Sequence, residues 1–375
     1  MYIASRSISV LLLAVAGLLS SCVGQTALPE SRFVEKAPDE PTTPLTEFIT
    51  VAAVGDIMLG SPYPNDTRMP PNDGADLLKE FTPLISAADI AFGNLEGPMV
   101  DGGTSTKCRP PRPGQPIRCF AFRMPTRYGK YLKDAGFDVL SLANNHALDF
   151  GAAGSLSTRQ TLDALGIKHA GSDKEKFSTV FIDVKGFRVA VVAFAHNAVV
   201  PNVNDLDAAR MLVSRAARDS DIVIVSFHGG AEGTDHQNVP RATEIYAGER
   251  RGNLPLFSRT VIDAGADLVL GHGPHVLRGL ELYKDRLIAY SLGNFATYGW
   301  FRLEAETALT MLLEVKLGAD GRFIEGRINS GRQEGRGIPV LDPDGAALKK
   351  VKALSAADFP DTSPRFETDG RILPR

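Results

Sequence analysis

The stretch FDVLSLANNHALDFG, residues 137–151, decides the fold class of this chain. Residues 137–142 form a short, mostly apolar run of the kind that makes a strand buried on both faces of a sheet. The chain then places two asparagines, a histidine and an aspartate within positions 144–149. A surface loop needs only polarity and a turn-forming residue, so this set of carboxamide, imidazole and carboxylate groups indicates a site at the end of a strand.

Five further apolar runs end on polar residues in the same way. They are FITVAAVGD (48–56), DIAFGNLE (89–96), FRVAVVAFAHN (187–197), DIVIVSFHGG (221–230) and DLVLGHGPH (267–275). Amphipathic segments lie between these runs, and two of them, TRYGKYLKDAG (126–136) and LPLFSRTVIDAG (254–265), show helical spacing and end in glycine. Buried strands that alternate with helices predict an α/β fold with mostly parallel strands.

The pattern changes near residue 278. Four closely spaced strand signals follow one another there: RGLELY, RLIAYSLGNF, TALTMLLEVKL and RFIEGRINS. The tripeptide Ala319-Asp320-Gly321 between the last two is typical of a hairpin turn. We predict a main domain over residues 48–330 and a C-terminal appendage over residues 331–375.

The N-terminus predicts export. Arg6 precedes the apolar run ISVLLLAVAGLL, which is short for a membrane span and is typical of a signal peptide over residues 1–21. The sequence Leu19-Ser20-Ser21-Cys22 resembles the lipobox of bacterial lipoproteins, which implies that Cys22 carries lipid and tethers the protein to a membrane. Plain secretion is the alternative. Residues 22–47 contain a proline-rich segment with few large apolar residues, and they are expected to form an extended tether.

The net charge and the cysteine content restrict the classes of partner and the cellular compartment that we expect for this protein. The formal net charge is −3 at pH 7, and no basic cluster in the sequence suggests nucleic-acid binding. Cys108 and Cys119 bracket the loop CRPPRPGQPIRC, and in an exported chain they predict a disulfide, with a pair of free thiols as the alternative.

The polar ends of the six strands should meet, because the carboxyl ends of parallel strands lie at one edge of a sheet. The residues that follow the six runs are Asp56, Asn94 and Glu96, Asn144 to His146 with Asp149, His196 and Asn197, His228 with Glu232, and His272 with His275. Mixed carboxylate, carboxamide and imidazole ligands suit zinc, manganese or iron, and their number favours two divalent ions. His169 and His236 close no apolar strand and are expected to be structural.

Six motifs in this order, VGDIMLG, GNLEGP, SLANNHALDFG, FHGGAEG, GHGPHV and YSLGNF, resemble the CapA (poly-γ-glutamate capsule synthesis, PGA_cap) family of the calcineurin-like metallophosphoesterase superfamily. The resemblance covers residues 48–330. It implies a four-layer α/β/β/α sandwich with a dinuclear metal centre. The metal ligands that it implies are Asp56, Glu96, Asn145, His228, His272 and His275.

The same resemblance implies that His146 is the catalytic residue. Asp149 either orients this imidazole or caps the helix that begins near Gly151. Glu232 and Asn294 are candidate supporting residues, and Asn144 is a turn former, a ligand or a substrate contact. The chain departs from the superfamily pattern at Met58, where a ligand histidine is expected, and at Glu96, where an aspartate is expected.

We therefore predict a metal-dependent hydrolase in the cell envelope, on the extracytoplasmic side. Its substrate would be a phosphoester or an anionic envelope polymer such as γ-linked polyglutamate, and its partners would include capsule-synthesis proteins and the membrane. A non-catalytic, lipid-anchored component of a capsular polymer assembly or export complex is the alternative.

Overall fold

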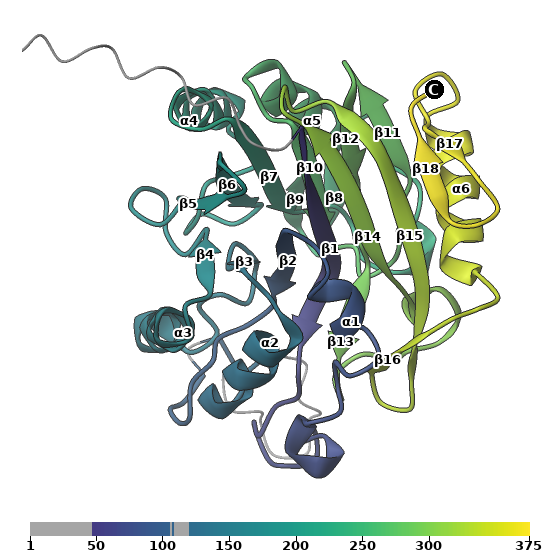
Figure 1. The fold of residues 1–375 in the computed structure, drawn as a ribbon. Helices are drawn as coiled ribbons and strands as arrows, with labels where there is room; N and C mark the ends of the chain where they lie inside the picture. The colour runs from purple at the N-terminus through teal and green to yellow at the C-terminus, as the bar shows by residue number, and fades with distance from the viewer. Residues whose placement is uncertain (1–46, 106, 109–119) are drawn as a thin grey trace, which may run out of the picture. The chain divides into compact units, whose positions relative to one another are not determined.

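The computed structural model describes residues 47–105, 107–108 and 120–375. The larger sheet has ten strands, of which β1 (Phe48–Met58) is central (Figure 1). On one side of β1, the sheet continues outward with three parallel strands, in the order β2 (Ile90–Leu95), β3 (Val139–Ser141) and β4 (Lys168–Ala170). On its other side lie the antiparallel strands β14 (Leu309–Gly318) and β15 (Phe323–Glu334).

The remaining strands extend this sheet at its edges. Strand β13 (Asn294–Thr297) pairs in parallel with the end of β1. Three C-terminal strands continue from β15: β16 (Ile338–Leu341), β18 (Arg371–Leu373) and β17 (Arg365–Phe366). The predicted boundary between main domain and appendage, at residue 330, thus lies inside β15, and the C-terminal segment is joined to the larger sheet.

The second sheet has six strands, and its four central ones are parallel. They run in the order β11 (Leu280–Tyr283), β12 (Arg286–Ala289), β10 (Leu268–His272), β7 (Ile222–His228), β6 (Phe187–Ala195) and β5 (Thr179–Val184). Strands β8 (Glu244–Tyr246) and β9 (Glu249–Gly252) form a separate hairpin.

The two sheets pack face to face, with helices on their outer faces. The alternation of side chains along β1 shows this arrangement: Val51 and Ala53 join the core shared with the second sheet, whereas Val54 on the other face packs under helices. Helices α1 (Thr82–Ile85), α2 (Gly129–Ala135) and α3 (Gly151–Leu165) cover the first sheet, and α4 (Leu206–Arg218) and α5 (Leu254–Asp263) cover the second. The predicted four-layer α/β/β/α sandwich is confirmed.

Helix α6 (Ala346–Asp358) lies beside β15 and β11 and adds Ala347 and Val351 to the core between the sheets (Figure 1). Short 3-10 helices occur at Pro71–Gly74, Thr126–Tyr128, Thr234–His236 and Ala305–Thr307. Along the described ranges, no helix is both long enough and apolar enough to cross a membrane.

All six predicted strands and the hairpin turn at residues 319–321 are confirmed. Helix α2 ends at Gly136, as predicted, and this glycine takes a left-handed φ of 96°. Three predictions for the N-terminal region, the signal peptide, the lipidated Cys22 and the tether up to residue 46, lie outside the described residues. Cys108 is disulfide-bonded, whereas Cys119 lies outside the described residues, so the predicted pairing stays a prediction.

Candidate metal centre

The ends of the strands bring the predicted residues together from both sheets. In the first sheet, Asp56 at the end of β1 is in register with Asn94 on β2 and with Asn294 on β13. In the second sheet, His228 at the end of β7 is in register with His272 at the end of β10. The sandwich therefore presents carboxylates and imidazoles to each other across the gap between the two sheets.

Glu96, which follows β2, is the centre of this cluster. Its side chain is fully buried, and its Oε1 atom lies 3.6 Å from Nε2 of His275, 3.9 Å from Nε2 of His146 and 4.0 Å from Nε2 of His228. These three imidazoles come from three different loops or strands. A carboxylate in this position can bridge to a cation that the imidazoles also reach.

Asp56 makes the second carboxylate of the cluster. Its Oδ1 lies 3.4 Å from Nδ1 of His272, and its Oδ2 lies 3.0 Å from Nδ1 of His275. Ligand atoms of Asp56, Glu96 and His275 all lie within 4.8 Å of one another. His275 has a positive φ of 57°, which is uncommon for a residue with a side chain and which turns the imidazole toward the two carboxylates.

Several buried ligand atoms in the cluster have no hydrogen-bond partner in the described part of the chain. They are Oε1 and Oε2 of Glu96, Oδ1 of Asn145, Nε2 of His228, and Nδ1 and Nε2 of His272. Buried polar atoms are almost always paired, because leaving one unpaired costs about 1–3 kcal/mol. Their convergence fits a divalent cation, which would accept lone pairs from oxygen and nitrogen together.

The pKa shifts of the residues in the cluster also favour a bound cation. Burial, together with the charge of Asp56, raises the pKa of Glu96 from 4.5 to about 8, although His275 opposes the rise. Burial by itself would lower the pKa of His275, but the carboxylates of Glu96 and Asp56 raise it to about 10. Burial holds the pKa of His228 well below its ordinary value. A buried carboxylate with a raised pKa, beside the neutral imidazole of His228, is an environment that a bound cation would stabilise.

His146 and Asp149 form a pair at one side of the cluster. Nδ1 of His146 lies 2.7 Å from Oδ2 of Asp149, which also accepts a 2.8 Å hydrogen bond from the backbone N–H of Phe122. The N-cap of α3 is Phe150, and no side chain caps this helix. Of the two roles left open for Asp149, the structure thus shows the contact that orients His146. Nε2 of His146 faces Glu96.

Comparisons with known proteins place the chain in a family. The family model "Bacterial capsule synthesis protein PGA_cap" matches residues 50–298. The chain belongs to this family. It is 33% identical to "PGA biosynthesis protein CapA" of Bacillus subtilis (strain 168) over 74% of this chain and 70% of that protein. It is 29% identical to "Capsule biosynthesis protein CapA" of Bacillus anthracis over 78% of this chain and 70% of that protein. A hypothetical protein from Thermus thermophilus has a similar structure, with a TM-score of 0.47 and 17% identity over 75% of this chain and 98% of that one.

The predicted resemblance to the PGA_cap family is therefore confirmed. Met58, the departure from the superfamily pattern, is fully buried at the end of β1 and offers no imidazole. Asn145 lies in the turn that also holds His146. Glu232 pairs with Arg251 at 2.8 Å, at the margin of the cluster. Asn294 accepts a hydrogen bond from Nδ1 of His275, at 3.0 Å, and so supports that imidazole.

Sequence reasoning missed the part played by Asn94 and left Asn144 undecided. Asn94 donates a 2.7 Å hydrogen bond to Oδ1 of Asp56, and its amide group also lies 3.3 Å from Nδ1 of His228. Asn144 donates to Oδ1 of Asn94 and to the carbonyl of Leu95, and it accepts from the backbone N–H of His146. These two carboxamides join the ends of three strands of the first sheet, β1, β2 and β3. The double asparagine in ANNH was the available signal.

Other histidines lie at the margin or outside the cluster. His196 is buried beside His228, with ring centroids 6.0 Å apart, and its Nε2 lies 3.3 Å from Oε2 of Glu249. It was recognised as a strand-end residue but not as a neighbour of a predicted ligand. His169 pairs with Asp163, as expected of a structural residue.

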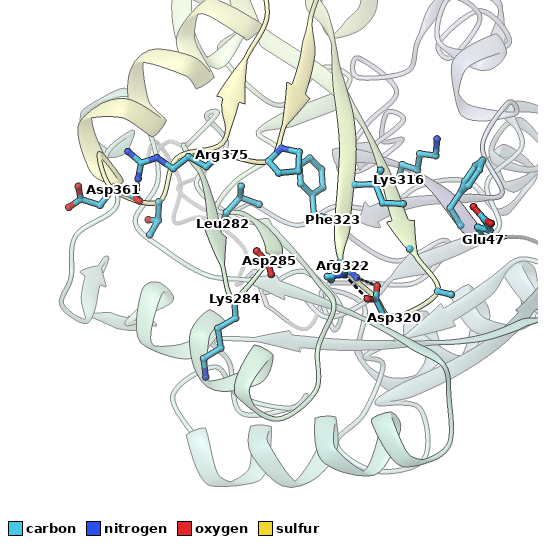
Figure 2. Close-up of a pocket in the computed structure, with 16 residues that line it drawn as sticks. Glu47, Leu282, Lys284, Asp285, Lys316, Asp320, Arg322, Phe323, Asp361 and Arg375 are labelled. Carbon is cyan, nitrogen blue, oxygen red and sulfur yellow. Dashed lines mark hydrogen bonds and ion pairs between the residues drawn. The ribbon is translucent and has the colours of Figure 1, made fainter.

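A cavity of about 1040 Å³ lies elsewhere, where β1 begins (Figure 2). Its lining includes both Lys284 and Asp285, and an ion pair joins Arg322 to Asp320 beside it. None of the predicted site residues lines this cavity. The chemistry is concentrated at the opposite ends of the parallel strands, around Glu96.

Proposed function

We propose that this PGA_cap protein is a metal-dependent hydrolase that acts in capsule biosynthesis. The observation that supports the proposal is the set of buried, unpaired ligand atoms around Glu96, contributed by strand ends of both sheets. A purely structural core would replace such atoms with apolar groups or pair them with one another.

Six residues would hold the metal: Asp56, Glu96, Asn145, His228, His272 and His275. Two divalent cations, of manganese, zinc or iron, suit this number of oxygen and nitrogen donors. When bound, the cations would polarise the bond to be cleaved and activate water for attack on it. Asn94 and Asn294 would keep the carboxylate of Asp56 and the imidazole of His275 in the orientation that binding needs.

His146 would transfer the proton. Its Nδ1–H donates to Asp149, which leaves Nε2 on the side of Glu96 with a lone pair. Burial lowers the pKa of His146, although Asp149 opposes this effect, so the imidazole is neutral at pH 7 and able to accept a proton. The protonated ring can then donate to the leaving group. Phe122 stacks on the ring with centroids 3.8 Å apart and limits its rotation.

The substrate would be a phosphoester or a γ-glutamyl amide in the cell envelope, since both reactions build negative charge on an oxygen beside the metal. The names of the two Bacillus relatives refer to PGA and capsule biosynthesis, which supports an envelope polymer. We also propose that Cys22 is lipidated and holds the protein on the extracytoplasmic side of a membrane, where it can meet capsule-synthesis proteins.

Metal analysis of the purified protein tests the proposal first. We expect about two equivalents of divalent metal per chain, and we expect Asp56→Asn and His272→Ala to lose metal while His169→Ala, a histidine outside the cluster, keeps it. The loaded protein would then be assayed with an aryl phosphodiester and with γ-linked polyglutamate. A folded protein that binds no metal would overturn the proposal and favour the non-catalytic, lipid-anchored assembly component.

A further inference from the structure

Three arginines converge on the loop of residues 61–68. Arg68 lies in this loop, where its carbonyl accepts from the backbone N–H of Ser61. Arg123 donates to the carbonyl of Pro62, and Arg336 donates to the carbonyl of Thr67. The three residues come from distant parts of the sequence, so the fold alone gathers them.

These arginines lack the acidic partners that half of the described arginines have. Arg127, Arg322 and Arg371 each pair with an aspartate at 2.5–2.8 Å. For Arg68, Arg123 and Arg336, by contrast, the structure shows no ion pair to any described residue. Because the chain as a whole carries a net charge of −3, this excess of positive charge is local.

Arg68 is the most exceptional of the three. Its guanidinium carbon lies 3.8 Å from the ring centroid of Trp300, and its side chain makes no hydrogen bond to the rest of the described chain. Burial and the neighbouring charge of Arg336 lower its pKa, so the two cations repel each other. The donors of Arg68 are therefore available to a ligand, and an anion would relieve the repulsion.

A series of aromatic contacts links Arg68 to His146 of the metal centre. Trp300 lies 5.3 Å from Phe122 between ring centroids, and Phe122 stacks on His146. The Nε1 atom of Trp300 is buried and has no acceptor among residues 47–105, 107–108 and 120–375. An anion held by Arg68 would thus lie on the same side of the cluster as His146, with Trp300 and Phe122 between them.

We propose that Arg68, Arg123 and Arg336 form a binding subsite for an oxyanion of the substrate, either a carboxylate or a phosphate. This proposal rests on the proposed function, because the subsite would hold a charged group of the substrate next to the bond that is cleaved at the metal centre. Guanidinium groups bind both oxyanions through paired N–H donors, and several arginines together suit a substrate with repeated negative charges.

Trp300 makes the proposal directly testable, because it is the only tryptophan of the chain. We would titrate the purified protein, freed of metal with a chelator, with γ-linked glutamate oligomers and separately with inorganic phosphate, and follow tryptophan fluorescence. We expect a saturable change that weakens as salt rises. Response to the oligomer alone would identify a carboxylate chain as the ligand, and response to phosphate alone would identify a phosphate group.

Arginine variants distinguish binding at this subsite from non-specific electrostatic attraction of the anion to the protein. Arg68→Gln and Arg336→Gln should each weaken binding on the order of tenfold, which corresponds to about 1.4 kcal/mol for a charge-assisted contact. Arg322→Gln removes the same charge near the distant cavity and should leave binding unchanged. Absence of a saturable signal with both ligands, or equal weakening in all three variants, would overturn the proposal. Since this assay requires neither metal nor turnover, its result is independent of whether the protein proves to be a hydrolase.

Discussion

Replacement of Glu96 by glutamine, which preserves shape and removes charge, is the most informative perturbation of this protein. In the metal-free protein, the buried carboxylate of Glu96 has no hydrogen-bond partner among the described residues, and three imidazoles face its Oε1. The same carboxylate would be a central ligand of the bound metal. Glu96→Gln should therefore have opposite effects on stability in the absence and in the presence of metal.

The magnitude follows from the pKa of Glu96, which rises from 4.5 to about 8 on folding. An acid with a raised pKa destabilises the fold as pH rises, by about 1.4 kcal/mol per pH unit between the two pKa values, so the penalty is absent below pH 4.5 and reaches about 3 kcal/mol at pH 7. The glutamine avoids this penalty but buries an amide at a cost of about 1–2 kcal/mol. The metal-free variant should be more stable than the metal-free parent by on the order of 1–2 kcal/mol.

Urea unfolding at pH 5 and pH 8, with a chelator or with excess Mn²⁺, measures both effects. With the chelator, we expect the advantage of Glu96→Gln to be present at pH 8 and to disappear near pH 5. With metal at about 100 times its Kd, the parent should gain about 2.7 kcal/mol and the variant much less, so the order reverses. A metal-free variant that is less stable than its parent at pH 8, or an equal gain from metal in both proteins, would refute this reasoning.

Three further outcomes are expected. Asp149→Asn should lower turnover by on the order of 10²-fold at unchanged metal content, because it misorients the proton-transfer imidazole; parallel loss of metal would contradict this role. Although burial by itself raises the pKa of Asp89, the ammonium group of Lys185 holds this pKa below its ordinary value. The ionised carboxylate of Asp89 therefore stabilises the fold fully at neutral pH, and this stabilisation is lost as pH falls through the folded-state pKa. The melting temperature of Asp89→Asn should accordingly lie furthest below that of the parent at pH 7, with the difference closing below about pH 4. Arg278 is fully buried in a two-bonded ion pair with Glu244, so Arg278→Met should cost about 3–5 kcal/mol in urea unfolding; the additional change Glu244→Leu should restore much of that loss.

The sequence predicted the strands well because each carries its own signal. In residues 221–230, for example, the apolar run, its length and the polar residues at its end can all be recognised from the local sequence alone. The strand-end rule then placed Asp56, His228 and His272 at one site, since parallel strands end together. Strand β4 and the edge strand β5 escaped notice because they are short or only half-buried.

The roles of Asn144 and Asp149 could not be read from their spacing. An asparagine in a turn has the same local sequence whether its side chain faces solvent or, as here, bridges Asn94 and Leu95. Asp149 precedes a helix and could have capped it, yet its carboxylate is held by His146 and by the backbone of Phe122. Phe122 is separated from Asp149 by 27 positions, so no local pattern links them.

The sequence by itself determined the family, the order of buried strands and the kinds of ligand at their ends, because apolar periodicity and polar strand ends are local properties of the chain. Only the tertiary structure decided that Oε1 of Glu96 faces three imidazoles, that Asn144 links two strand ends, and that Arg68 stacks on Trp300. These contacts depend on strand order and register, which bring residues scores of positions apart within a few ångströms. These contacts contribute to stability only when both partners are buried together in the folded protein. The sequence could therefore identify the ligands but not the arrangement that brings them together in a site.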